Sequence, residues 1–294
     1  MFTMFRNWTV FIGKVLYGAG RAMVNSLSFE LAGHIAYTGL LAIFPFLIFL
    51  AALAGFLAGV LGEYGGSLAS VQAMLDLLPE DVRATLSPVI REVLTRRDGG
   101  LLTLGLIGAL WVASSGIDAL RIALNSSYGF SEPRPWWLIR LGNLGAILLG
   151  GFVFILLSVA IVLGPLIWQG LLWLFPLSNA ERWAFILFRY GIAALVLTAG
   201  LLALHRWLPG RHLKWRHLLP GALATTVLWL VAAGMFSLYV ARLGNYSATY
   251  GSLGGVIVTL VFFYVSAVLF IFGAEVNAAL LRRRSVKKPP VDAA

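Results

Sequence analysis

The stretch LGGVIVTLVFFYVSAVLFIFGA, which covers residues 253–274, contains no charged side chain. A bilayer has a hydrocarbon core about 30 Å thick, and roughly 20 helical residues rising about 1.5 Å each are needed to cross it. This stretch is therefore long enough to span a membrane as a single helix. It is also apolar on every side, which a helix at the surface of a water-soluble protein is not. The stretch predicts a transmembrane helix.

Six long apolar segments of this kind divide the chain. Hydrophobic residues make up 60% of the sequence and charged residues only 12%, whereas about a quarter of the residues in a soluble domain are charged. The predicted fold class is therefore all-α, a polytopic membrane protein with six transmembrane helices. The six segments lie near residues 34–62, 101–127, 138–175, 183–207, 218–243 and 251–281.

The pattern predicts three parts along the chain. Residues 1–30 form a cytoplasmic N-terminus with a helix, near 7–29, that lies in the membrane interface. Residues 31–283 form the membrane domain, in which residues 63–100 make a short helical extracytoplasmic segment. Residues 284–294 form a basic cytoplasmic tail.

The interfacial helix is expected to have an apolar side and a basic side. Lys14 and Arg21 would face lipid head groups, because cationic side chains of such helices lie beside anionic lipids. The apolar side would carry Trp8, Phe11, Val15 and Leu16.

The distribution of lysine and arginine predicts the orientation. Most of the 22 basic residues fall in the N-terminal region, in the connections after the second and fourth segments, and in the tail. Cytoplasmic connections of membrane proteins carry an excess of basic residues. Both termini are therefore predicted to be cytoplasmic, which an even number of spans also requires.

Composition narrows the range of partners and cofactors. The net charge of +10 is explained by basic cytoplasmic loops beside anionic lipids, so no nucleic-acid partner is expected. The chain has no cysteine, which excludes disulfides and thiolate metal sites, and its four histidines do not match zinc-ligand spacing. No metal or cofactor is predicted.

Polar side chains gather near the expected cytoplasmic ends of three spans. An ionisable group at mid-bilayer costs at least about 2.5–3.5 kcal/mol on insertion scales, so each such group needs a partner or water. Within the second span, offsets of four, three and four residues place the polar side chains on one helical face. The candidate substrate-binding or gating residues are Ser114, Asp118, Arg121, Asn125, Glu275, Asn277, Glu30 and His34.

Two interpretations of this polar layer remain open. It is either the wall of a polar cavity that opens to the cytoplasm, or a set of salt-bridged helix ends whose side chains reach toward head groups. Small residues add a packing prediction, because glycines four residues apart, such as Gly251 and Gly255, let another helix approach closely.

Three stretches of the chain resemble the YihY/BrkB family of bacterial inner-membrane proteins, formerly described as ribonuclease BN-like. They are AGHIAYTGLLAIFP at 32–45, ALRIALNSSYG at 119–129 with RPW at 134–136, and NYSATYGSLG at 245–254 with GAEVN at 273–277. The chain departs from the family at His34, where a small or apolar residue is usual. The resemblance implies a six-helix protein of the bacterial inner membrane, with envelope phenotypes that look like transport of lipids or envelope precursors.

The leading hypothesis is an inner-membrane transporter or flippase for a lipid or another anionic amphiphilic envelope component. Asp118, Arg121 and Glu275 would bind or gate, with Arg121 as the candidate ligand for a phosphate. The expected partners are membrane lipids and the anionic substrate, and a homo-oligomer remains open.

Other classes of function compete with transport of an amphiphile. A non-catalytic scaffold for envelope assembly would recruit a partner through 63–100 or the basic tail, and a secondary ion transporter is also open. An enzyme is not expected, since ribonuclease chemistry needs clustered carboxylates or histidines in water, and the cytoplasmic loops carry mainly Glu132 as an acid.

Overall fold

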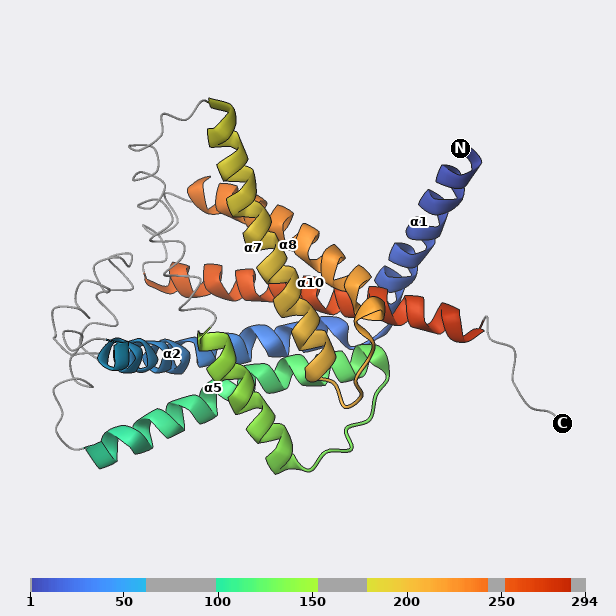
Figure 1. Ribbon diagram of the computed structural model, residues 1–294. Coiled ribbons are helices and arrows are strands. Elements are labelled where there is room, and N and C mark those ends of the chain that lie inside the picture. Colours follow the sequence, from blue (N-terminus) through green and yellow to red (C-terminus); the bar gives the residue numbers. More distant parts are fainter. Residues whose placement is uncertain (1, 62–98, 153–178, 243–251, 287–294) are drawn as a thin grey trace. The chain divides into compact units, whose positions relative to one another are not determined.

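The computed structural model describes residues 2–61, 99–152, 179–242 and 252–286 (Figure 1). Within these residues all regular structure is helical and no strand occurs, which confirms the all-α prediction for the described part of the chain. In chain order the helices are α1 (Phe2–Asn25), α2 (Ser28–Leu61), α5 (Gly99–Tyr128), Trp136–Phe152, α7 (Asn179–Trp207), α8 (Trp215–Arg242) and α10 (Ser252–Val286).

Each predicted apolar segment coincides with one of these helices as far as the segment is described. The predicted extracytoplasmic segment 63–100 lies outside the described residues except for its last two positions. The later half of the third segment, the NYSATY sequence and the last residues of the basic tail also lie outside them.

The first helix boundary differs from the prediction. α1 ends at Asn25, and α2 begins at Ser28 rather than near residue 34. The Ser26 hydroxyl contacts the Met23 carbonyl oxygen at 3.4 Å and the Ser28 hydroxyl at 2.7 Å. Serine side chains that bond to nearby polar groups in this way favour helix ends over helix interiors. Glu30 lies in the first turn of α2, where a negative charge is favoured.

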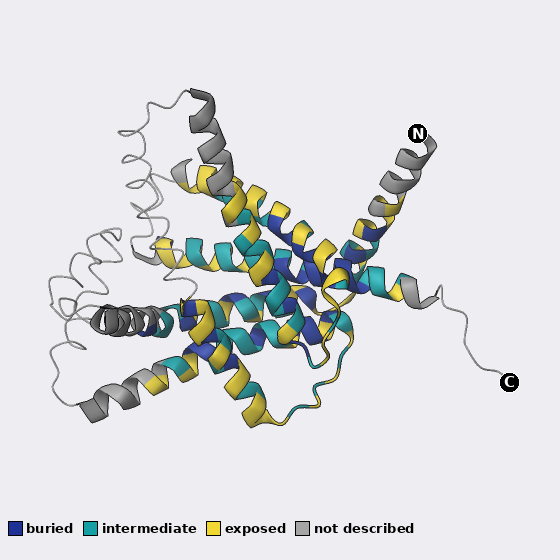
Figure 2. Ribbon diagram, viewed as in Figure 1, coloured by how far each residue is buried: buried dark blue, intermediate teal, exposed yellow. Residues whose placement is uncertain are grey.

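Two described helices are long and apolar enough to cross a membrane, namely Trp215–Val240 in α8 and Gly254–Arg283 in α10. Trp136–Phe152 and Ala194–Trp207 are shorter apolar helices. α8 also exposes large apolar side chains along its length (Figure 2). Apolar surface of this extent is normal against lipid and rare against water. The total of six spans remains a prediction.

The chain forms two compact units, and the boundary between them falls inside α2 and α5. The first unit contains residues 1–40, 118–135 and 179–294. In it α10 lies against α8 and α1, and α7 lies against α8 (Figure 1). The second unit contains residues 41–117 and 136–178.

The cores of the two units are built from different helices. In the first unit the C-terminal half of α10 is largely buried (Figure 2). In the second unit Phe49, Ala113 and Ile147 form a buried cluster, and the Arg140 guanidinium lies 3.8 Å from the centroid of the Trp111 ring.

Glycines set the distance between α8 and α10 in the first unit. A Cβ atom added to Gly221 would overlap the Gly273 carbonyl oxygen and the Asn277 side chain, and one added to Gly273 would overlap the Thr225 hydroxyl. Close approach of membrane helices depends on small residues of this kind. At the predicted packing glycine Gly255, by contrast, an added Cβ meets no described atom within 4 Å.

Candidate functional site

The C-terminal end of α5 has a geometry that directs the following loop. The Phe130 amide donates to the Asn125 carbonyl oxygen at 2.9 Å, and the Gly129 amide donates to the Ser126 carbonyl oxygen at 3.2 Å. These two bonds define a Schellman cap, which requires a residue with positive φ after the last helical residue. Gly129 has φ 69° and supplies that residue without steric cost. The cap turns the chain back toward the side of α5.

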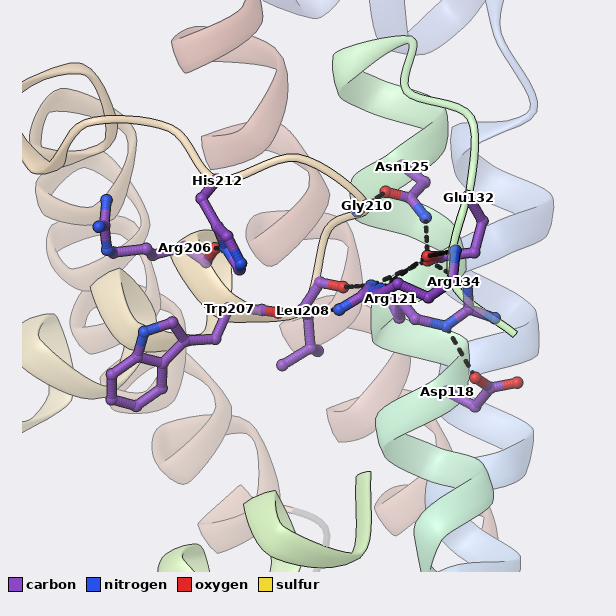
Figure 3. A network of polar contacts seen from close by, with 10 residues as sticks. All are labelled: Asp118, Arg121, Asn125, Glu132, Arg134, Arg206, Trp207, Leu208, Gly210 and His212. Atoms are coloured by element: carbon purple, nitrogen blue, oxygen red, sulfur yellow. Dashed lines mark hydrogen bonds and ion pairs between the residues drawn. The ribbon is translucent and has the colours of Figure 1, made fainter. Parts of the chain in front are cut away.

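This turn brings the loop carboxylate of Glu132 to the polar face of α5 (Figure 3). Arg121 donates from Nη1 to Glu132 Oε2 at 2.8 Å and from Nε to Asp118 Oδ1 at 2.9 Å. Asn125 donates to Glu132 Oε2 at 3.1 Å. The Arg134 guanidinium donates two hydrogen bonds to the same carboxylate, from Nε to Oε1 at 2.7 Å and from Nη2 to Oε2 at 2.9 Å. We call these five residues the Glu132 cluster.

The Glu132 cluster also holds the connection between α7 and α8 (Figure 3). Arg134 Nη2 donates to the Leu208 carbonyl oxygen at 2.6 Å, at the end of α7. The Gly210 amide donates to Asn125 Oδ1 at 2.8 Å. The Arg134 guanidinium and the Asn125 side-chain amide therefore join the loop after α5 and the end of α5 to the α7–α8 connection.

The charges of the cluster stabilise the ionised form of Glu132. Its hydrogen bonds from Arg134, and then those from Arg121 and Asn125, lower the pKa of this carboxyl to about 2, although burial acts in the opposite direction. The Glu132 side chain is only 18% exposed and the Arg121 side chain only 12%. Both side chains are therefore largely shielded from water, and each is ion-paired.

A second cluster lies around the Tyr128 hydroxyl in the same unit. Asn277 Oδ1 accepts from the Gly221 amide at 2.8 Å, which fixes the orientation of the side-chain amide because a backbone amide can only donate. Asn277 Nδ2 then donates to the Leu218 carbonyl oxygen at 3.1 Å and to the Tyr128 hydroxyl at 3.3 Å. The Tyr128 hydroxyl lies 2.7 Å from His205 Nδ1. We call these groups the Tyr128 cluster.

The His205 ring contacts the Tyr128 hydroxyl through Nδ1. That hydroxyl also accepts from Asn277, and the tautomer of His205 decides whether the hydroxyl or the ring donates in their contact. His205 is fully buried, and Nε2 has no hydrogen-bond partner among the described residues. The ring packs edge-on against Phe270, with centroids 4.9 Å apart.

Glu275 lies beside the Tyr128 cluster on α10. It is 3% exposed, and its carboxylate is hydrogen-bonded by the Ser127 hydroxyl. Its Oε2 has no hydrogen-bond partner among the described residues and lies 3.8 Å from the guanidinium of Arg282. Arg282 is 64% exposed and also donates to the Ser127 carbonyl oxygen at 3.3 Å. A buried carboxylate is thus joined to an exposed arginine by a long ion pair.

The structure divides the predicted polar layer between these places. Asp118, Arg121 and Asn125 belong to the Glu132 cluster, while Asn277 and Glu275 belong to or adjoin the Tyr128 cluster. Asp118 pairs with Arg121, whereas Glu275 pairs with Arg282. Because Arg121 already contacts two carboxylates, it is a poor candidate ligand for a phosphate.

The remaining predicted site residues make no described hydrogen bond to either cluster. Ser114 is fully buried, donates to the Trp111 carbonyl oxygen of its own helix at 2.7 Å, and belongs to the second unit. Glu30 and His34 are exposed near the start of α2. The described contacts include none from the Glu30 carboxylate or the His34 ring to either cluster.

Sequence reasoning did not select Glu132, Arg134, Tyr128, His205 or Arg282 as site residues. For Glu132 a signal was present, since it is an isolated acid among basic residues in a loop with two prolines. His205 and Tyr128 carry no comparable signal. Within the described ranges, no group of three or more His, Cys, Asp or Glu side chains is placed to hold a metal ion.

Comparisons with known proteins give consistent relatives. The family model described as Virulence factor BrkB matches residues 21–294. The Putative ribonuclease-like protein YfkH of Bacillus subtilis is 32% identical over 262 residues, which are 87% of this chain and 90% of that protein. A UPF0761 membrane protein of Tolumonas auensis is 27% identical, over 85% of this chain and 80% of the relative.

A UPF0761 membrane protein of Chromobacterium violaceum is 26% identical over 90% of this chain, and the chain spans 62% of that longer protein. No solved structure gives a significant match.

Proposed function

The chain belongs to the virulence factor BrkB family of membrane proteins, and we propose that it moves a lipid or another anionic amphiphile across the bacterial inner membrane. The proposed topology is six spans with both termini in the cytoplasm. The proposed site is the pair Glu275 and Arg282, which replaces Asp118 and Arg121 as the centre of the mechanism. An enzymatic activity is not part of this proposal.

The observation that supports the proposal most is that Glu275 is buried with one carboxylate oxygen that lacks a hydrogen bond among the described residues. An ionisable group within an apolar span is costly and is therefore a functional-site hypothesis by default. Glu275 is in such a span, is buried, and keeps one carboxylate oxygen without a hydrogen bond among the described residues. A side chain that only braced the fold would be expected to have both oxygens satisfied.

Arg282 supplies the complementary part of the proposed mechanism. Its guanidinium is largely exposed and lies 3.8 Å from Glu275, beyond hydrogen-bonding distance. Guanidinium groups bind phosphate through parallel hydrogen bonds. An anionic head group would compete with Glu275 for Arg282, so its arrival would release the carboxylate. This exchange of partners would couple head-group binding to a rearrangement at the end of α10.

The two clusters would hold the frame in which this exchange takes place. The Glu132 cluster joins the end of α5 to the α7–α8 connection, and Asn277 joins α10 to α8 and to Tyr128. Apart from His205 Nε2, the polar side-chain groups that make these contacts have hydrogen-bond partners among the described residues. They therefore fit a bracing role better than a binding role.

Reconstituted vesicles test the proposal directly. Purified protein should accelerate the movement of fluorescent anionic lipids between leaflets relative to empty vesicles, and Glu275→Gln and Arg282→Gln should each lower that rate at least about tenfold. Thr259→Val is the matched control on α10, because among the described residues its hydroxyl bonds only to the Gly255 carbonyl oxygen in the same helix. Wild-type protein that moves no anionic lipid faster than empty vesicles would refute the proposal.

The name of the Bacillus subtilis relative suggests a competing activity. If that name applied here, purified protein would cleave RNA, and the same preparations provide the assay. RNA cleavage that copurifies with the protein, together with absent lipid movement, would favour the enzyme over the transporter.

A further inference from the structure

α1 has three faces of different chemistry. Successive helical residues are about 100° apart, so residues spaced by four or seven share a face. The first face carries Val15, Ala19 and Met23, which are 4%, 0% and 4% exposed. Val15 and Ala19 form a buried cluster with Val276 of α10. This face is occupied by protein.

The second face of α1 is apolar and exposed. Tyr17 and Val24 are seven residues apart and are 72% and 71% exposed, and Leu16, at the border with the first face, is 40% exposed. The described structure covers none of them. Val15, which was expected on a lipid-facing side, lies instead against α10, so the exposed apolar surface is a different sector of the helix.

The third face is basic and adjoins the second. Lys14 and Arg21 are seven residues apart and both are exposed. Arg283 of α10 extends the positive charge, since its Nη2 donates to the Lys14 carbonyl oxygen at 2.9 Å and its guanidinium lies 5.9 Å from the Phe11 ring centroid. An exposed apolar sector beside a basic sector is the pattern of a helix that lies in a membrane surface.

The position of α1 on α10 fits the same arrangement. The residues of α10 that contact α1 include Phe272, Val276 and Leu280, near the C-terminal end of the apolar stretch Gly254–Arg283. Figure 1 shows α1 leaving α10 steeply rather than running along it. A helix that meets a spanning helix steeply near its end lies close to the membrane plane.

We propose that α1 binds the surface of an anionic leaflet, with Tyr17 and Val24 facing acyl chains and Lys14 and Arg21 facing lipid phosphates. Charge complementarity selects this occupant, because the apolar sector is bordered by basic residues that attract anionic head groups. The Arg283 bond to the Lys14 carbonyl oxygen holds α1 to the end of α10. This inference requires a membrane protein but does not require lipid transport.

Neighbouring residues of α1 provide a sharp test. The chain has no cysteine, so one introduced cysteine carries a single environment-sensitive fluorophore. Full-length Val24→Cys and Asn25→Cys are labelled and placed in nanodiscs that contain phosphatidylglycerol. The label at 24 should be quenched by lipids that carry a quencher on the acyl chain, whereas the label at 25 should be quenched by iodide in the water.

Two results would overturn the placement of α1. If the labels at 24 and 25 are equally open to iodide, the helix does not lie in the leaflet. If the label at 24 is shielded from both quenchers, another protein surface covers this face.

The charge part of the proposal is tested with lipid composition. Acyl-chain quenching at 24 should be at least about twofold stronger with phosphatidylglycerol than with phosphatidylcholine alone. The double variant Lys14→Gln, Arg21→Gln should abolish this difference, whereas Arg211→Gln, Lys214→Gln removes the same charge elsewhere and should preserve it. Equal quenching of the parent protein in both lipids would refute anionic selectivity.

Discussion

At the scale of single residues, Glu132 is the side chain whose carboxylate accepts hydrogen bonds from Arg121, Asn125 and Arg134 together. Glu132→Gln leaves Arg121 and Arg134 without their shared carboxylate, and bonds to charged groups contribute about 1.5–3 kcal/mol each before solvent exposure is considered. We expect a net loss of about 1–3 kcal/mol at pH 7, measured as a lower thermal unfolding midpoint in detergent. Asp118→Asn should cost less, because Asp118 is 33% exposed.

The effect of Glu132→Gln should also depend on pH. The pKa of Glu132 is lowered to about 2 in the folded protein, so ionisation favours the folded state. This stabilisation is complete above the ordinary pKa of about 4.5 and declines as the pH falls from there toward 2. The difference in unfolding midpoint between wild type and variant should therefore shrink below about pH 4.5. A difference that stays constant from pH 7 to pH 3 would contradict the assigned charge state.

Asn277 is a residue whose role depends on the direction of its bonds. Asn277→Leu keeps most of the volume but leaves the Gly221 amide without its acceptor and breaks the bonds to Leu218 and Tyr128. We expect a destabilisation of about 2 kcal/mol, since membrane proteins partly compensate such losses. Thr259→Val on the same helix should change the midpoint little. An unchanged midpoint in Asn277→Leu would show that Asn277 does not brace α10 against α8.

At the scale of elements, the α8–α10 contact depends on glycines that the sequence pattern did not identify. Gly221→Ala and Gly273→Ala should each lower the unfolding midpoint, because the added methyl group overlaps atoms of the facing helix. Gly234→Ala is the matched control, since its Cβ meets no described atom within 4 Å, and replacing a glycine inside a helix there should be neutral or stabilising. Similar effects at all three positions would contradict this packing.

At the scale of the whole molecule, the predicted topology has a direct test. Alkaline phosphatase is active outside the cytoplasm and green fluorescent protein fluoresces inside it. Fusions that end after residue 80 should therefore be active as the phosphatase, and fusions after residue 294 should fluoresce. Phosphatase activity at residue 294 would mean that the number of spans is odd or that the orientation is reversed.

Much of the element structure was predictable because it depends on local properties. An apolar run such as 253–274 is helical wherever it lies in lipid, and the pairing of Asp118 with Arg121 follows from a spacing of three within one helix. The start of α2 was predicted six residues too far along the chain. The length of the apolar run does not reveal the polar turn at Ser26 and Ser28.

The candidate site was predictable only in part. Depth along each span grouped Glu275 and Asn277 with Asp118, but depth carries no information on which way a side chain points. Asp118 and Glu275 were therefore grouped although they contact different partners. Arg282 was interpreted only as part of a basic tail, yet its guanidinium lies beside Glu275.

The sequence by itself determined a helical membrane protein of this family. Hydrophobic length and charge distribution set whether a segment prefers lipid or water, and this preference needs no tertiary contact. Only the tertiary structure decided which polar groups are neighbours. The bond between Asn277 and Tyr128 joins residues 149 positions apart, and that between Gly210 and Asn125 joins residues 85 apart. Hydrogen bonds act over about 3 Å, so their partners are set by how the helices pack and by how the Gly129 cap turns the loop.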